Sequence, residues 1–464
     1  MKYHYFLIVL SLLISSLNGC SNYNPFETDD ETSSEPTITP DDDSTPPPPN
    51  TDVRGIPVDP VEDEFVGLDP ISNLNAIIDQ QNLLPYLKKG HKQGKRLKVA
   101  ILDNGFAGLS HSKGKRLPPD VKTFAAPGNE MASTAHGTKM AEIVYAIATG
   151  SSAYSPQISG PEMLLLNTNG YTNLLHAIDT VINENVDIVL YAQVWEYGGN
   201  FDGKGFINKE VDRALEAGVL WVNAAGNLGQ ATWNGNVDIN SNRYLELPYK
   251  LREDSSHSYL RFTVPQSNTP TKIVLAWNDF TDQKEYKTPQ DLDIELLDEQ
   301  GQLINSSTLV QTGLFRAGPQ YSTHAREIIY ENLNTGLYKL RIKAKSYNFD
   351  EQSMIRVTVN GMGIYMLEQT RIPTVLIPAE NPNVLTVGAT DVDYSGLTLE
   401  KPEIKLRSEV IFGLDQNYKG TSAATAIAVG TLAVYFNHFG PISKAAIDQK
   451  IIENPKFLSV ELPD

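Results

Sequence analysis

The segment YKGTSAATAIAVG, from Tyr418 to Gly430, places a Gly-Thr-Ser triplet directly before a run of small and apolar residues. In one interpretation, Thr421 or Ser422 caps a buried helix, because small hydroxyl side chains accept hydrogen bonds from the free amides of the first turn. In the other, Ser422 is a nucleophile in the positive field of a helix N-terminus. The second interpretation requires a base, an acid that orients the base and an oxyanion donor elsewhere in the chain.

Upstream of this segment, short apolar runs alternate with stretches of helical spacing. The apolar runs are Val99–Leu102, Val186–Val194, Gly218–Asn227 and Asn383–Asp391, and helical spacing occurs in Leu68–Leu87, Thr172–Asn185 and Asn208–Ala217. This alternation predicts an α/β fold, in which right-handed crossovers place helices on both faces of a parallel sheet. Ligands of such sheets bind at the carboxyl ends of the strands, where Asp103 and Asn227 fall.

The pattern changes between residues 237 and 365. Short segments such as HSYLRFTVPQ, TKIVLAWNDF and GLYKLRIKA alternate apolar and polar residues and are separated by Gly, Asn and Asp turns. They predict an antiparallel β-sandwich. Because the α/β pattern resumes at Thr374, we expect residues 237–365 to be a domain inserted into a discontinuous α/β domain made of residues 68–236 and 366–464.

Four residues with useful chemistry fall at the ends of predicted elements. Asp103 ends a strand in AILDNGF, His136 opens HGTKMAEIVYAIA, Asn227 ends a strand in NAAGN, and Ser422 opens a helix in GTSAATA. Taken singly, each has an ordinary explanation as a turn, a cap or a satisfied histidine. Together, in this order, they match the groups that acyl transfer requires.

These four motifs, with LIPAENPNVLTVGATD from Leu376 to Asp391, resemble those of the subtilisin-like serine proteases, the subtilase family, whose catalytic residues follow the order Asp, His, Ser. The resemblance spans roughly residues 68–236 and 366–462. It implies a subtilisin-like fold and a serine endopeptidase that hydrolyses peptide bonds of a polypeptide substrate.

The resemblance also implies a role for each residue. Ser422 would be the nucleophile, His136 the base that takes its proton, and Asp103 the acid that orients the base. The side-chain amide of Asn227 and the backbone N–H of Ser422 would hold the oxyanion.

Three features depart from the family pattern. Asn104 stands where the family usually has Ser or Thr, and Ala426 stands where it usually has Pro. Ala192, Gln193 and Val194 form the expected substrate-binding segment, which the family usually builds from Ser-Leu-Gly. Val194 in place of Gly predicts a narrowed P1 pocket or a blocked path for an extended peptide.

The altered substrate-binding segment keeps two other functions open. One is a non-catalytic, protein-binding lipoprotein on a subtilase scaffold, that is, a pseudoprotease, against which the intact set of four residues argues. The other is a hydrolase of non-peptide esters.

The inserted segment resembles the pre-peptidase β-sandwich, particularly at DLDIELLDEQG. Asp291 and Asp293 in this segment are either ligands of a structural calcium ion or solvated carboxylates on one strand face. We expect no other metal and no cofactor.

The first residues are typical of an export signal, predicted to span residues 1–19. Lys2 precedes an apolar run from Tyr5 to Leu17 that is too short to cross a bilayer. The run is followed by Cys20, which is the only cysteine in the chain, and the sequence LNGC at residues 17–20 resembles a bacterial lipobox. The alternative is an ordinary secretory signal in which the cysteine occurs by chance. The resemblance implies an acylated, palmitate-bearing Cys20 that anchors the protein in the cell envelope, with Ser21 favouring the outer membrane or cell surface.

The charge of the chain is unevenly distributed. The formal net charge is −18, and the segment from Phe26 to Pro70 holds 14 acidic residues against the single Arg54. Residues 20–67 are therefore predicted to be a disordered, acidic and Pro-rich tether. Since no basic stripe occurs, nucleic acid is not an expected partner, whereas a polypeptide substrate and, through the lipid, a membrane are.

Overall fold

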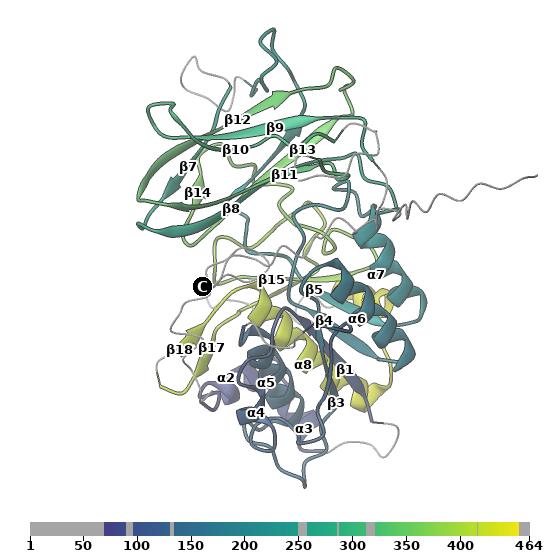
Figure 1. Ribbon diagram of the computed structural model, residues 1–464. Helices are drawn as coiled ribbons and strands as arrows, with labels where there is room; N and C mark the ends of the chain where they lie inside the picture. The colour runs from purple at the N-terminus through teal and green to yellow at the C-terminus, as the bar shows by residue number, and fades with distance from the viewer. Residues whose placement is uncertain are drawn as a thin grey trace, which may run out of the picture. The chain divides into compact units, whose positions relative to one another are not determined.

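The computed structural model describes residues 69–89, 96–129, 134–248, 258–284, 287–311, 321–414 and 416–453 (Figure 1). The predicted signal, Cys20 and the predicted tether lie outside these ranges. Among the described residues, no helix combines the length and the hydrophobicity that crossing a bilayer requires.

A seven-stranded parallel sheet lies at the centre of the α/β part, in the order β16-β15-β5-β4-β1-β3-β2. Its strands are β1 (Lys98–Asp103), β2 (Lys122–Phe124), β3 (Glu162–Asn167), β4 (Ile188–Tyr191), β5 (Leu220–Ala224), β15 (Leu385–Ala389) and β16 (Ile404–Leu406). The central strands consist mainly of buried apolar residues because both faces of a parallel sheet are covered. The predicted parallel α/β fold is confirmed.

Helices cover both faces of this sheet (Figure 1). In β1, Val99 and Ile101 pack with residues of α5 and α8, whereas Ala100 and Leu102 pack with residues of α6 and α7, as the two-residue period of a strand requires. The first face carries α2 (Leu74–Gln80), α3 (Leu84–Leu87), α4 (Leu109–Ser112), α5 (His136–Thr149), α8 (Thr421–Phe439) and α9 (Lys444–Glu453); the second carries α6 (Tyr171–Asn183) and α7 (Phe206–Glu216).

Small residues let α8 approach its neighbours closely. Ala423, Ala424 and Ala426 are fully buried. A Cβ added to Gly430 would lie 2.8 Å from the Cβ of Ile147 in α5, a distance that real side chains avoid. The composition of the Tyr418–Gly430 segment therefore has a packing cause.

Two departures from the predicted elements have local causes. The helical spacing of Leu68–Leu87 forms two short helices, α2 and α3, and Asn82 between them adopts a left-handed backbone with φ of 52°. The strand β3 was not predicted, although its EMLLLN sequence is an apolar run of the expected kind.

The segment between the two parts of the parallel sheet forms antiparallel β-structure, as predicted. One sheet has the order β10-β9-β12-β7-β14 and the other the order β11-β8-β13-β6. Their strands are β6 (Thr232–Asn236), β7 (Leu260–Val264), β8 (Thr269–Trp277), β9 (Leu292–Leu297), β10 (Leu303–Ser307), β11 (Arg326–Leu333), β12 (Gly336–Ala344), β13 (Met354–Asn360) and β14 (Tyr365–Met366). The strand β6 precedes residue 237 and joins the second sheet through β13.

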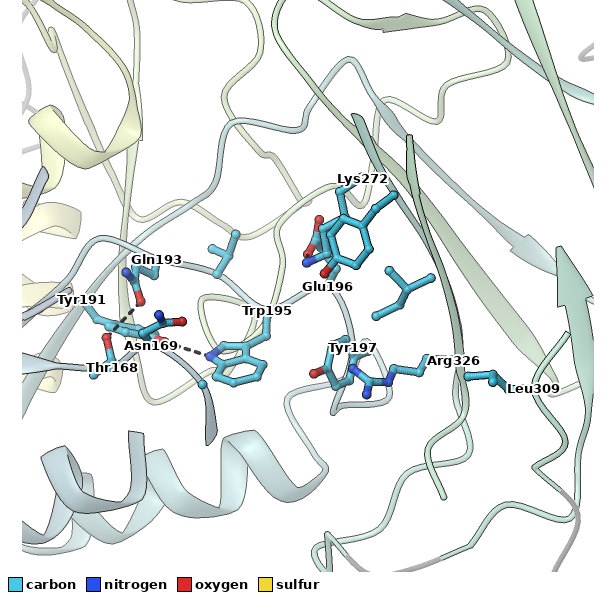
Figure 2. A pocket seen from close by; sticks show the side chains of 14 residues that line it. Thr168, Asn169, Tyr191, Gln193, Trp195, Glu196, Tyr197, Lys272, Leu309 and Arg326 are labelled. Carbon is cyan, nitrogen blue, oxygen red and sulfur yellow. Dashed lines mark hydrogen bonds and ion pairs between the residues drawn. The ribbon is translucent and has the colours of Figure 1, made fainter. Parts of the chain in front are cut away.

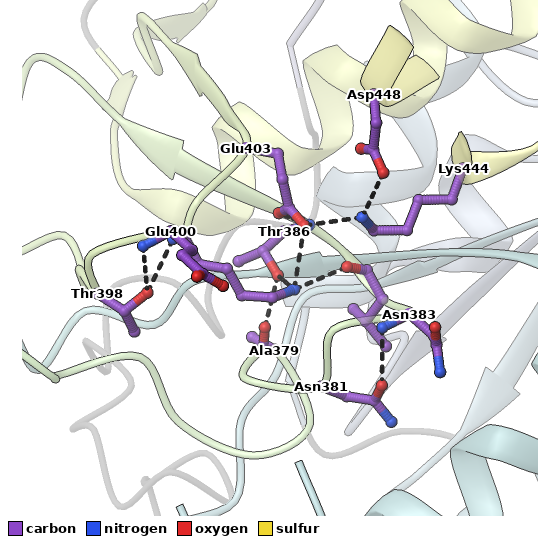
Figure 3. Close-up of polar contacts among 11 residues, drawn as sticks. Ala379, Asn381, Asn383, Thr386, Thr398, Glu400, Glu403, Lys444 and Asp448 are labelled. Carbon is purple, nitrogen blue, oxygen red and sulfur yellow. Dashed lines mark hydrogen bonds and ion pairs between the residues drawn. The ribbon is translucent and has the colours of Figure 1, made fainter. Parts of the chain in front are cut away.

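A buried polar network attaches α9 to the edge of the parallel sheet (Figure 3). The Lys401 Nζ donates to the Val384 carbonyl at 2.7 Å and to the Thr386 hydroxyl at 2.8 Å. Glu403 lies between Lys401 and Lys444, at 3.3 Å and 3.1 Å from their ammonium groups. Each charged group of the network therefore has a polar partner.

Candidate active site

The carboxyl end of β1 and the first residue of α5 bring Asp103 and His136 together. The Nδ1 of His136 lies 2.6 Å from Oδ2 of Asp103, whose Oδ1 accepts a hydrogen bond from the backbone N–H of Asn104 at 2.8 Å. Asp103 is 1% exposed and His136 is 9% exposed. Because an ionised carboxylate only accepts hydrogen bonds, Nδ1 carries the proton and Nε2 is the basic nitrogen of the neutral ring.

The glycine after His136 permits this approach. A Cβ added to Gly137 would lie 2.5 Å from a ring carbon of Phe106 and 2.7 Å from the Gly105 carbonyl oxygen. Without that atom, the Gly137 backbone N–H donates to the same carbonyl at 3.1 Å. The HGT motif thus allows the start of α5 to lie directly against the loop that follows β1.

Ser422 is the second residue of α8, and Gly420 precedes the helix. The Gly420 backbone has φ of 132°, which favours glycine, and Gly420 is the N-cap residue, which has no side chain with which to cap the helix. The interpretation of Thr421 or Ser422 as an N-cap is therefore wrong, because both lie inside the first turn.

The hydroxyl of Ser422 and the imidazole of His136 are not hydrogen-bonded to each other. The Ser422 Oγ donates to the Ala192 carbonyl oxygen at 3.3 Å. The His136 Nε2 is buried and has no hydrogen-bond partner within the described ranges. The ring of Tyr418 lies nearby, its centroid 6.1 Å from that of His136.

Asn227 is oriented by the first turn of α8. Its Oδ1 accepts hydrogen bonds from the Thr421 backbone N–H at 3.1 Å and from the Thr421 hydroxyl at 2.9 Å. A Cβ on Gly420 would lie 3.3 Å from Nδ2 of Asn227, so glycine also leaves room for the amide. With Oδ1 engaged, the Nδ2 group is the side of the amide that can donate to a ligand.

Ala192, Gln193 and Val194 follow β4 and are all buried. Val194 packs with Leu228, Ala231 and Leu376. One of its methyl carbons lies 3.4 Å from the position that a Cβ on Gly226 would take. The valine side chain therefore fills space between the loops after β4 and β5 that a glycine would leave open.

Gln193 is held by its neighbours through one end of its amide. Its Oε1 accepts a hydrogen bond from the Thr168 hydroxyl at 3.0 Å, and its backbone carbonyl accepts one from the Asn223 side chain at 3.0 Å. Its Nε2 is buried without a hydrogen-bond partner in the described part of the chain. Next along the chain, Trp195 pairs with Ile377 in an antiparallel bridge.

A family model matches part of this chain. The model of the Subtilase family matches residues 94–256. This range includes Asp103, His136 and Asn227, while Ser422 lies beyond it. Given the seven-stranded parallel sheet and its helices, the fold is subtilisin-like.

Two solved structures illustrate how distant the similarity is. The CspB protease of Clostridium perfringens is 13% identical, and the match covers 77% of this chain and 88% of that one with a TM-score of 0.47. A lanthipeptide protease is 16% identical over 35% of this chain and 51% of that one, with a TM-score of 0.25. No curated protein matches the sequence significantly.

The antiparallel sheet of β11, β8, β13 and β6 contacts the loops after β4 and before β15 through polar groups. The ammonium of Lys272 on β8 donates to the Glu196 carboxylate, and both side chains are buried. Arg356 on β13 lies 3.5 Å from the Glu380 carboxylate. Neither pair is signalled by the sequence, because its members lie on segments far apart in the chain.

Asp293 lies on β9 and Asp291 directly precedes this strand. Burial, and then the neighbouring Asp293 carboxylate, raise the pKa of Asp291 to about 6. Asp293 has a counter-charge in Lys345, at 3.3 Å. No group of three or more His, Cys, Asp or Glu residues in the described ranges is arranged to hold a metal ion. A calcium site at these residues stays a prediction.

Proposed function

We propose that this protein is a serine endopeptidase that hydrolyses peptide bonds, with Ser422 as nucleophile, His136 as general base and Asp103 as the acid that orients the base. One observation carries the proposal. The contact of Asp103 with Nδ1 leaves the Nε2 of His136 buried, basic and without a partner among the described residues. A buried polar atom without a hydrogen bond costs about 1–3 kcal/mol, and a reacting hydroxyl is the group that would offset this cost.

The first chemical step requires Ser422 to change its hydrogen-bond partner. Rotation about its Cα–Cβ bond must take Oγ from the Ala192 carbonyl to the Nε2 of His136, as catalytic hydrogen bonds often form only with substrate bound. The Oγ then attacks the substrate carbonyl while its proton passes to Nε2. The Asp103 carboxylate stabilises the resulting imidazolium.

The second half of the reaction uses the same groups. The imidazolium of His136 donates its proton to the leaving amine, which leaves an ester between Ser422 and the acyl part of the substrate. Water then attacks this ester, again with His136 as base. In both steps the Asn227 Nδ2 and the Ser422 backbone N–H are suited to hold the oxyanion, and the N-terminal end of α8 adds a favourable field.

A serine-reactive fluorophosphonate probe tests the proposal. We expect it to label the wild-type protein and the Ser151→Ala control, in which a serine outside the site is removed, but not Ser422→Ala. Labelling together with casein hydrolysis supports the endopeptidase. Labelling with activity only on small esters supports an esterase, and a folded protein that is not labelled supports the non-catalytic binding protein.

We also propose that Cys20 is acylated and anchors the protein in the bacterial cell envelope. The support is the LNGC sequence at the end of an apolar run, with Cys20 the only cysteine in the chain. We expect Cys20→Ser to move the protein from the membrane fraction to the soluble fraction. A variant that still floats with membranes would contradict this assignment.

A further inference from the structure

A buried serine outside the proposed catalytic triad contacts the residue that precedes α8. Ser408 lies two residues after β16, and Asp391 lies two residues after β15. Because Ala389 of β15 pairs with Leu406 of β16 in a parallel register, the residues that follow these strands emerge side by side. The Ser408 hydroxyl donates to Oδ1 of Asp391 at 2.6 Å, and the Ser408 backbone N–H donates to the same oxygen at 2.8 Å.

The same hydroxyl accepts a hydrogen bond from the backbone of Gly420. The Gly420 N–H donates to Ser408 Oγ at 3.0 Å, and Ser408 is fully buried. Because a backbone N–H can only donate, the hydroxyl hydrogen must point to Asp391 and a lone pair of Oγ to Gly420. The Asp391 carboxylate therefore fixes the direction in which Ser408 receives the Gly420 N–H.

Gly420 sets the direction of the groups that we assign to the oxyanion hole. It has no side chain, and its φ of 132° lies in a region open to glycine, so hydrogen bonds such as the one to Ser408 fix its orientation. The next residue, Thr421, donates its backbone N–H to Oδ1 of Asn227 at 3.1 Å, and the amide of Ser422 follows. A rotation of the Gly420 peptide would displace both the Asn227 Nδ2 and the Ser422 N–H.

We propose that Ser408 is a positioning residue for the oxyanion hole. Its hydroxyl, oriented by Asp391, holds Gly420 so that the donors of Asn227 and Ser422 converge on one oxygen. The role rests on the endopeptidase function proposed above, and Ser408 acts through Gly420 without contacting the substrate. Preorganised donors stabilise the transition state only when they are correctly placed, and a misplacement of about 1 Å can cost a factor of about 10² in rate.

Steady-state kinetics of Ser408→Ala on a fluorogenic peptide test this role. We expect kcat to fall about 10–100-fold, which is less than the effect of losing an oxyanion donor outright. KM should stay within about three-fold of the wild-type value, because the displaced donors act on the transition state and not on the bound substrate. A Ser408→Ala variant with the wild-type kcat would overturn the positioning role.

A second anchor shows what a substrate-positioning contact should do instead. In Figure 2 the Thr168 hydroxyl donates to Oε1 of Gln193, in the expected substrate-binding segment, at 3.0 Å. Thr168→Val removes this anchor and should raise KM. A Ser408→Ala variant whose loss falls on KM in the same way would also overturn the proposal, because it would place Ser408 with substrate binding.

Ser353→Ala is the matched control for stability. The Ser353 hydroxyl also donates to an Asp carboxylate, Oδ1 of Asp350 at 2.9 Å, and accepts the backbone N–H of Asp350 at 3.0 Å. Ser353 is buried like Ser408, but it directly precedes β13 in the antiparallel β-structure. We expect this variant to keep kcat within about two-fold. A loss as large as that of Ser408→Ala would assign both effects to stability and overturn the positioning role.

A double-mutant cycle tests whether Ser408 acts through the oxyanion donors. In the Asn227→Ala background one of the two donors is gone. Adding Ser408→Ala to this background should therefore lower kcat by a factor about five times smaller than it does in the wild-type protein. A residue that only stabilises the fold would lower kcat by the same factor in both backgrounds, and that result would overturn the proposal.

Hydrogen exchange separates failure of this inference from failure of the endopeptidase function. Mass spectrometry of the peptide that spans residues 418–424 should show exchange about 10-fold faster in Ser408→Ala than in the wild-type protein, and no change in Ser353→Ala. If this holds for a protein that hydrolyses nothing, the anchor of Gly420 stands and the endopeptidase proposal fails. Full peptidase activity of Ser408→Ala would overturn the positioning role and leave the endopeptidase proposal standing.

Discussion

Glu327 of β11 is expected to make the stability of the protein depend on pH. Its side chain is fully buried, and it accepts hydrogen bonds from the Ser307 hydroxyl and, at 2.5 Å, from the Gln311 side-chain amide. Burial penalises the carboxylate and outweighs these hydrogen bonds, which raises the pKa of Glu327 from its ordinary 4.5 to about 8. The substitution Glu327→Gln tests this pH dependence, because glutamine has nearly the same shape as glutamate but cannot ionise.

The sign follows from proton linkage. A raised pKa in the folded state means that the folded protein holds the proton more tightly than the unfolded chain. The stabilisation is therefore fully present below pH 4.5 and is lost as the pH rises towards 8. One pKa unit corresponds to about 1.4 kcal/mol, so the loss over this interval is on the order of 5 kcal/mol, taken as an upper bound.

Urea unfolding between pH 5 and pH 8.5 measures this effect. The quantity of interest is the free energy of unfolding of Glu327→Gln minus that of the wild-type protein, because other titrating groups cancel in the difference. We expect the difference to rise by several kcal/mol between pH 5 and pH 8 and then to level off. The exposed Glu299→Gln variant is the control and should give a flat difference. A flat difference for Glu327→Gln would refute the reasoning.

Three further predictions concern the site and the sheet edge. Val194→Gly should raise kcat/KM for peptides with bulky P1 side chains. It should also lower the free energy of unfolding by about 2–4 kcal/mol, because a buried valine side chain is lost and glycine increases the entropy of the unfolded chain. Unchanged kinetics in a peptide-library assay would show that Val194 does not line the P1 pocket. Asn227→Ala should lower kcat about 10²–10³-fold with little change in KM, and a loss below about three-fold would argue against an oxyanion role. Burial lowers the pKa of Lys401 from 10.5 to about 8, so the cost of its charge is present below pH 8 and disappears towards pH 10.5. The wild-type protein should therefore gain stability relative to Lys401→Met over that interval in thermal unfolding, and parallel curves would contradict this.

Local patterns in the sequence were sufficient for the fold class, whereas the roles of the candidate site residues come from the resemblance to a family and stay a prediction. Apolar runs that end at turn residues predict buried parallel strands, because the side-chain period and the turn chemistry are properties of neighbouring residues. The same local information places Asp103 at the end of a strand and His136 at the start of a helix, and the structure brings the two within hydrogen-bond distance. Alternation and turn spacing also predict the antiparallel sheets that the structure forms between β6 and β14.

Contacts between distant segments were decided only by the tertiary structure. The N-cap of α8 is Gly420 and not a hydroxyl residue, and Asn227 from a distant loop accepts hydrogen bonds from Thr421 in the first turn. Val194 fills its space because Leu376, far along the chain, packs against it. The hydrogen bond that holds Gly420 likewise depends on where the end of β16 places Ser408. Residue type and periodicity determine whether a segment forms a helix or a strand. Which side chains meet between distant segments depends on how those segments align and pack in the folded protein, and no local pattern contains that information.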